Sequence, residues 1–167
     1  MTETNLAIST LAFPLGSCRG ITHSLTRLDS GNVIRNVNGA ALDLTRPGFQ
    51  KYKLSVSVSD TSTATLGGIW KGAAVSVDCA IPLRHKTTTT SVTLERDPVS
   101  GSVRAYLVSD GSSISTSVVG RVVTLAAFVG VAVVEYRPAL SCVVLEVSQS
   151  FDEWAGSESW SLDLEEA

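Results

Sequence analysis

The chain has 167 residues, of which 44% are apolar and 17% are charged, and its formal net charge is −3. This length is sufficient for one domain with its own apolar core, and the charged fraction is below the roughly 25% that is usual in soluble domains. Three widely spaced cysteines, Cys18, Cys79 and Cys142, argue against a disulfide framework and for folding in a reducing compartment. The longest apolar run, from Val122 to Val134, is too short for a membrane span of about 20 residues.

The N-terminal part has the least regular pattern of the chain. Several prolines and glycines, among them Pro14 and Gly20, interrupt any long element there. We therefore expect an irregular N-terminal arm over residues 1–31, with at most two short strands. A single β-domain over residues 32–167 is expected to follow it.

A hairpin is predicted directly after this arm. Residues 32–37 and 40–44 are rich in apolar side chains and flank the dipeptide Asn38-Gly39. Such a dipeptide between apolar runs predicts a type I′ turn, in which both central residues have a positive φ. The sequence Thr45-Arg-Pro-Gly is expected to close the hairpin.

Two later segments alternate between apolar and polar residues, as expected for strands of an antiparallel sheet with one buried face. Residues 52–59 place Leu54, Val56 and Val58 on one face and serines on the other. Residues 74–81 repeat this pattern. Both segments are therefore predicted strands with one face toward the core.

The central part of the chain predicts further strands. Residues 87–96 and 103–109 are expected to pair with each other across a turn at 97–101. Residues 114–136 contain one or two apolar strands, because their β-branched residues and Gly130 argue against a helix.

The C-terminal part predicts two more strands. Residues 138–148 are apolar on both faces, which favours a place in the middle of the fold or under an interface. A loop is expected over residues 150–157, and a last strand over residues 160–165. Eight to ten short strands with regular turn signals, and no long amphipathic helix, predict an all-β, antiparallel sandwich or barrel.

The charge is unevenly distributed. All 13 Lys and Arg residues precede residue 138, and the remaining 30 residues carry seven acids. These acids are Glu146, Asp152, Glu153, Glu158, Asp163, Glu165 and Glu166. A molecule with one acidic end can join its copies head to tail, although a solvated acidic tail has the same composition. The alternation of Trp160, Leu162 and Leu164 predicts a paired strand here, with its acids near a basic neighbour.

No motif in the sequence predicts catalysis or a metal site. Gly16-Ser-Cys-Arg-Gly20 fits the G-x-C-x-G form of a nucleophile elbow, but no helix pattern follows Cys18, as that turn requires. Cys18 and His23 lack the paired spacing of zinc ligands. We expect no enzyme activity, no metal and no cofactor.

Two other functions are poorly indicated. Asp152, Glu153 and Glu158 could form the carboxylate pair of a glycosidase, but solvated loop acids have the same pattern. The basic residues are scattered and lack an aromatic platform, so we expect no nucleic-acid partner.

Several segments resemble a family of small proteins of tailed bacteriophages. They are Arg35-Asn-Val-Asn-Gly-Ala-Ala-Leu-Asp-Leu-Thr-Arg-Pro-Gly-Phe-Gln-Lys-Tyr52, Gly68-Ile-Trp-Lys-Gly72, Val75-Ser-Val-Asp-Cys79, Tyr136-Arg-Pro-Ala-Leu140, Ser150-Phe-Asp-Glu-Trp-Ala-Gly156 and Trp160-Ser-Leu-Asp-Leu-Glu-Glu166. The resemblance covers about half of the chain, and the Thr-rich segment 87–109 departs from it. It implies a virion component that folds in the host cytoplasm and carries over no catalytic residue.

The resemblance leaves the position in the particle open. We expect a structural protein that forms a ring or layer in the tail, baseplate or neck, through contacts with its own copies and with other virion proteins. A capsid decoration or cementing protein is one alternative. A module that binds a host-surface glycan through Trp154 and neighbouring acids is another, and a membrane partner is not expected.

The candidate interface residues follow from the aromatic residues and their neighbours. Aromatic side chains contribute most of the binding energy of many interfaces, although each can equally be a core residue. The candidates are Trp70, Phe151, Asp152, Glu153, Trp154 and Trp160.

Overall fold

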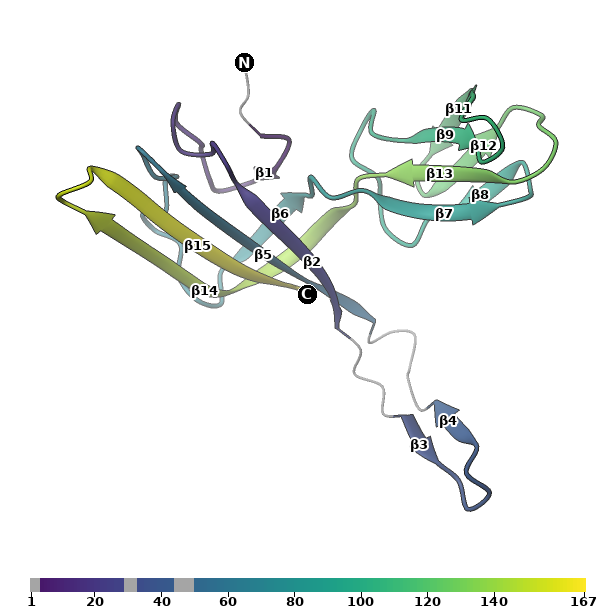
Figure 1. The fold of residues 1–167 in the computed structure, drawn as a ribbon, viewed down its shortest axis with the longest axis horizontal. Helices are drawn as coiled ribbons and strands as arrows, with labels where there is room; N and C mark the ends of the chain where they lie inside the picture. Colours follow the sequence, from purple (N-terminus) through teal and green to yellow (C-terminus); the bar gives the residue numbers. More distant parts are fainter. Residues whose placement is uncertain (1–3, 29–32, 44–49) are drawn as a thin grey trace. The chain divides into compact units, whose positions relative to one another are not determined.

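The computed structural model describes residues 4–28, 33–43 and 50–167, and every regular element in these ranges is a strand (Figure 1). The predicted all-β, antiparallel class is confirmed. Fifteen strands exceed the eight to ten expected, because several predicted segments are divided into shorter strands. The strands are β1 (Ala7–Ile8), β2 (Thr22–Leu28), β3 (Val33–Arg35), β4 (Ala41–Asp43), β5 (Lys51–Asp60), β6 (Ala74–Asp78), β7 (Leu83–Thr87), β8 (Ser91–Thr93), β9 (Arg104–Leu107), β10 (Ser113–Ile114), β11 (Thr116–Val119), β12 (Val122–Leu125), β13 (Ala132–Tyr136), β14 (Ala139–Asp152) and β15 (Ser157–Glu166).

The strands form four sheets. The largest has the order β1-β6-β14-β15-β5-β2, and the others are β10-β9-β13-β7, β11-β12-β8 and the pair β3-β4. By internal contacts the chain divides into two compact units, one of residues 1–11 and 75–141 and one of residues 12–74 and 142–167. The single domain after an N-terminal arm stays a prediction. The arm itself contributes β1, which pairs with β6, and β2, which pairs with β5.

The second unit is built around β15. This strand pairs with β14 on one side and with β5 on the other, so the predicted C-terminal strand is confirmed and is longer than expected. Its Trp160, Leu162 and Leu164 are buried. They share a face with the buried side chains of β5, where the predicted alternation is also confirmed. The ring of Phe13 stacks on Trp160 with 6.1 Å between the ring centroids.

The first unit has its own core. Buried side chains from β9, β12 and β13 form it, and Leu94 completes it. The cluster comprises Leu94, Ala105, Val123, Leu125, Ala132, Val134 and Tyr136. The short strands β8, β11 and β12 pair with one another, and β13 lies between β7 and β9.

The predicted pairing of residues 87–96 with 103–109 is wrong. β8 pairs with β12, whereas β9 pairs with β13 and β10. The intervening turn is held elsewhere, because Val99 N donates to Arg137 O and Ala139 N donates to Asp97 O, each at 2.8 Å. A turn that is hydrogen-bonded to a third segment does not close a hairpin.

The predicted hairpin is present as β3 and β4, with Ile34 opposite Leu42. Its turn is not type I′, because Gly39 has a φ of 78° while none of the described residues other than glycine has a positive φ. Gly39 N donates to Asn36 O at 2.9 Å, and the Asn36 side chain accepts from Asn38 N and Ala40 N. This is a three-residue loop with glycine in the left-handed position. The predicted closing turn at 45–48 lies outside the described residues.

The long strand β14 differs from its prediction in two ways. Leu140, Cys142 and Val144 are buried, but the side chains on its other face are only half-buried. The expected loop at 150–157 is shorter, because β14 continues to Asp152 and β15 begins at Ser157.

Candidate functional site

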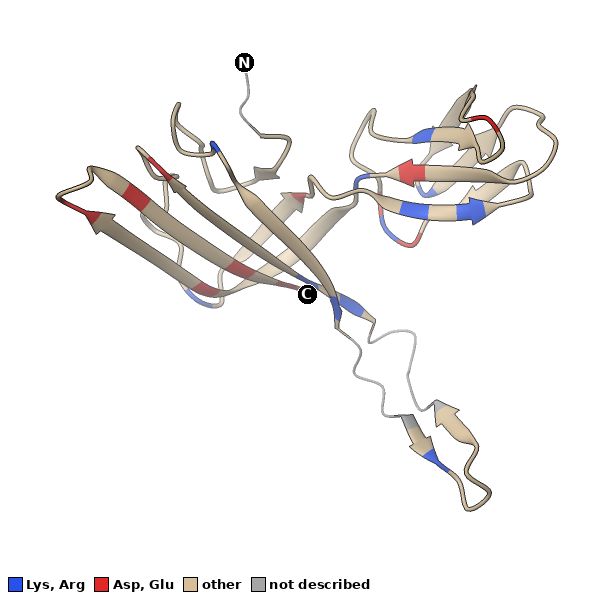
Figure 2. Ribbon diagram, viewed as in Figure 1, with Lys and Arg blue, Asp and Glu red and all other residues tan. Residues whose placement is uncertain are grey.

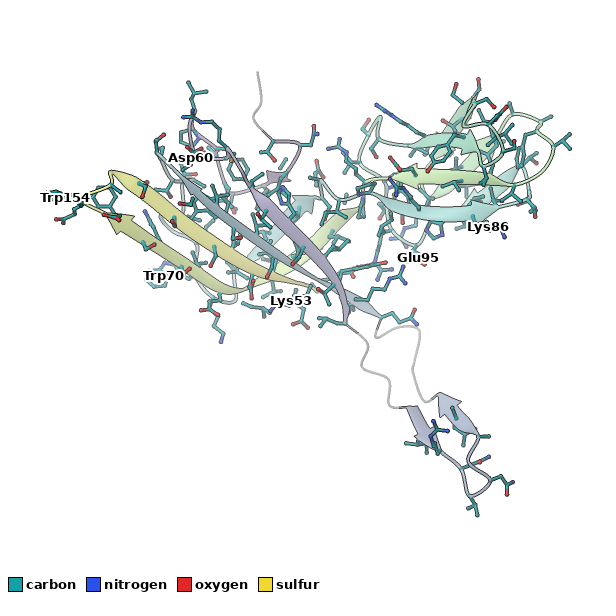
Figure 3. The ribbon with its side chains drawn as sticks, viewed as in Figure 1. Lys53, Asp60, Trp70, Lys86, Glu95 and Trp154 are labelled. Carbon is teal, nitrogen blue, oxygen red and sulfur yellow. The ribbon has the colours of Figure 1, made fainter. Side chains whose placement is uncertain are left out.

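The tip of the β14–β15 hairpin presents an aromatic pair to solvent. Trp154 is fully exposed and Phe151 is 58% exposed, and Figure 3 shows Trp154 projecting from the end of the hairpin. The carboxylate of Asp152 accepts hydrogen bonds from Trp154 N and Ala155 N, both at 3.0 Å, so it holds the turn. Glu153, beside Trp154, is exposed. The structure therefore brings together four of the six candidate residues.

One edge of β14 is free over its second half. The segment just before β6 stays hydrogen-bonded to β14 as far as Val144. Val144 O accepts from Gly72 N at 2.8 Å, and Val144 N donates to Ala73 O at 2.9 Å. A β-bulge follows between Val144 and Glu146. Over residues 145–152 none of the described strands pairs with the edge opposite β15, and Figure 1 shows this half of β14 at the border of its sheet.

Trp70 lies close to the start of this free edge. It precedes Gly72 by two residues and is 78% exposed. Ala73 N donates to Trp70 O at 3.0 Å, which closes a turn immediately before β6. Trp70 is the candidate residue on this side of β14 (Figure 3).

Trp160 has a different place from the other candidates. It is only 2% exposed, and its indole Nε1 donates to Ser17 O at 3.3 Å. A buried ring with a satisfied N–H is typical of a core residue. Trp160 therefore offers almost no surface to a partner, which is the alternative that the sequence left open.

Hydroxyl groups line the outer face of the sheet formed by β14, β15, β5 and β2. Strand register aligns them in rows, and Ser148 Oγ lies 2.7 Å from Ser161 Oγ, while Ser159 Oγ donates to Ser59 Oγ at 3.0 Å. The rows are Ser148–Ser161–Ser57–Thr22 and Ser150–Ser159–Ser59. A shallow hollow of about 440 Å³ lies over these residues. The serine alternation in the sequence is the signal for this face, but by itself it predicts only exposure to solvent.

The acids of β15 have a basic neighbour, as the sequence predicted. Lys53 Nζ lies 2.8 Å from an Asp163 carboxylate oxygen, and Ser55 Oγ donates to the same carboxylate. These hydrogen bonds from Lys53 and Ser55 hold the pKa of Asp163 below its ordinary value. Figure 2 shows acids and no Lys or Arg along β14 and β15.

The G-x-C-x-G segment forms a turn with a buried centre. The Cys18 side chain is 1% exposed, and its Sγ lies 3.6 Å from Ser17 Oγ. Asp60 accepts a hydrogen bond from Arg19 N at 2.8 Å, which fixes this turn to the end of β5. His23 is half-buried on β2, and its Nδ1 has no hydrogen-bond partner. Burial lowers its pKa below 6.5.

The described residues hold no group of three or more His, Cys, Asp or Glu side chains placed to bind a metal ion. Within residues 4–28, 33–43 and 50–167 no helix has the length and hydropathy needed to cross a membrane.

Comparison with known proteins gave no match. No protein-family model matches the chain, and no curated protein or solved structure matches it either.

Proposed function

We propose that this chain is a structural protein of a tailed-bacteriophage virion, forming a ring or layer in the tail, baseplate or neck. The resemblance of its segments to a phage family supports the virion assignment. The observation that carries the proposal is the free edge of β14, which ends at the fully exposed Trp154. The chain would fold in the host cytoplasm, to which the buried thiols of Cys18, Cys79 and Cys142, none of them in a disulfide, are suited.

An open strand edge that ends in exposed aromatic residues favours association with another chain. An unpaired strand edge offers a row of N–H and C=O groups to any extended segment that approaches it. Exposed aromatic side chains at its end add apolar area that is favourable to bury. The outer face beside it carries hydroxyls, whose removal from water costs less than that of charges. The three features together favour protein–protein contact.

The test is to locate the protein in purified particles. Heads and tails of a phage that encodes this chain are separated and analysed by mass spectrometry. Recovery with the tail, baseplate or neck fraction is expected. Recovery only with heads would favour the capsid decoration alternative, and absence from both fractions would overturn the virion proposal.

A host-glycan module is the second candidate, and the exposure of Trp154 favours it. Sugar rings stack on exposed aromatic faces, often with a carboxylate nearby to accept hydrogen bonds from hydroxyls. The carboxylate of Asp152 is already engaged by two backbone amides, which leaves Glu153 for this role. A glycan array compared between the wild-type protein and Trp154→Ala decides this alternative, because a glycan module must lose its signal in the variant.

A further inference from the structure

We propose that the β3–β4 hairpin of one copy pairs along the free edge of β14, residues 145–152, in a second copy. This inference rests on the proposed function and names the two segments that make the contact between copies. Four observations support it: the exposed apolar side chains of the hairpin, the unpaired edge of β14, the match between the apolar faces of these two segments, and the opposite charges of Arg35 and Glu146.

The hairpin has little to stabilise it alone. An isolated two-stranded hairpin is at best marginally stable in water. Ile34 and Leu42 lie opposite each other on one face and are 41% and 45% exposed. Val37 at the turn is fully exposed. Among the described residues, β3 and β4 pair only with each other, and about two fifths of each of Ile34 and Leu42 is open to solvent.

The edge of β14 lacks a neighbouring strand over residues 145–152 in the described part of the chain. Its residues after Val144 pair with β15 on one side only. Natural sheets usually shorten, cover or charge such edges, because an open edge pairs with other chains. An added strand would satisfy the free N–H and C=O groups of residues 145–152.

The apolar faces of the two segments match. Register places Val147 opposite Leu162, and Phe151 follows on the same face of β14. This is the face that carries the core side chains of the second unit. A strand of the hairpin added to the edge would place Ile34 and Leu42 beside these residues and extend the apolar face.

Arg35 and Glu146, which lie on the opposite faces of the two segments, carry opposite charges. Arg35 is one residue from Ile34, so it lies on the other face of the hairpin. Glu146 lies opposite Asp163, on the hydroxyl-lined face of β14. Arg35 Nη1 donates to Gly39 O at 3.0 Å, and the guanidinium has further N–H donors for a carboxylate. Pairing that aligns the apolar faces therefore brings Arg35 to the acidic side.

The contact joins two different surfaces of identical chains. Such heterologous contacts generate rings when the rotation closes and filaments when it does not. A heterologous contact is compatible with the ring proposed above. The two complementary segments belong to the same sequence, which favours a second copy over an unrelated partner.

Charge reversal in the full-length protein tests the proposal. Arg35→Glu and Glu146→Arg each place like charges at the contact, so we expect each variant alone to have its association weakened more than tenfold, as measured by light scattering. Mixing the two variants restores opposite charges at every contact between unlike copies. The mixture is therefore expected to assemble as the wild type does.

The control variant is Lys86→Glu, which makes the same charge change as Arg35→Glu at an exposed position of β7. Its association should equal that of the wild type. Circular dichroism of all variants checks that they are folded.

A second measurement traps the contact covalently. Chains with Leu42→Cys and chains with Gln149→Cys are mixed and oxidised, and a disulfide-linked pair of unlike chains is expected, whereas Val129→Cys replaces Gln149→Cys in the control. The native thiols are buried. A wild type that stays monomeric, charge variants that associate like the wild type, or no linkage of unlike chains would each overturn the hairpin contact. These outcomes leave the location of the protein in the particle to the fractionation experiment, so the two proposals fail separately.

Discussion

At the scale of the residue, His23 is a source of pH dependence near neutral pH. It lies opposite Val56 on β2, where burial lowers its pKa below 6.5 and its Nδ1 has no hydrogen-bond partner. The folded state thus prefers the neutral ring, and the unfolded state binds more protons below pH 6.5. This contribution to the free energy of unfolding falls as the pH is lowered through 6.5, and levels off below the folded-state pKa.

The variant His23→Leu removes this titration. We expect the free energy of unfolding to rise by about 1 kcal/mol at neutral pH, because a partly buried nitrogen without a partner is replaced by an apolar side chain. The difference in the free energy of unfolding between the variant and the wild type should widen as the pH falls below 6.5. Urea unfolding at a series of pH values measures it. A gap that stays constant with pH would show that His23 keeps its ordinary pKa.

At the scale of the element, the sequence predicted strands better than it predicted their partners. The alternation in β5 and β15 identifies both the strand and its buried face, because each follows from neighbouring residues. The pairing of β8 with β12 rather than β9 depends on hydrogen bonds of the 97–101 turn to distant segments. The sequence contains no local signal for such contacts.

In the candidate site too, local patterns could be predicted from the sequence, whereas contacts between distant segments could not. Trp154 and Phe151 lie at an exposed tip, whereas the alternation in β15 already predicts that Trp160 is on the buried face. The contacts that complete its burial, with Phe13 and Ser17, come from far away in the chain. The free edge of β14 could not be predicted from the sequence either. It exists because the neighbouring strand β6 is much shorter than β14. The hydroxyl rows need the register of four strands to become visible.

The strand β15 is the element on which the second unit depends most. Deleting residues 158–167 removes both neighbouring ladders and the buried Trp160, Leu162 and Leu164. We expect the truncated chain to lose cooperative unfolding, as followed by circular dichroism on heating. Leu162→Ala should cost about 2–5 kcal/mol, whereas Ser159→Ala on the hydroxyl face should stay within about 0.5 kcal/mol. A truncated protein with an unchanged melting temperature would mean that β15 adds nothing to folding.

At the scale of the whole molecule, stability and assembly should depend on different tryptophans. Trp160 is buried and hydrogen-bonded, whereas Trp154 is fully exposed at the end of a free edge. Asp152 and Glu153 directly precede Trp154 in the chain, whereas the other acids of β14 and β15 are spread along both strands (Figure 2). Replacing a residue at an interface should change association, whereas replacing a core residue should change the free energy of unfolding.

Trp160→Ala is expected to lower the free energy of unfolding by about 3–5 kcal/mol, as for a large core side chain. Trp154→Ala should change it by less than about 0.5 kcal/mol, because the ring contacts solvent. The order reverses in assembly: Trp154→Ala should weaken association of the folded protein by more than about tenfold, which corresponds to about 1.4 kcal/mol. Chemical unfolding measures the first quantity and light scattering the second. If Trp154→Ala assembled normally while Trp70→Ala did not, the interface would lie at the start of the β14 edge rather than at its tip.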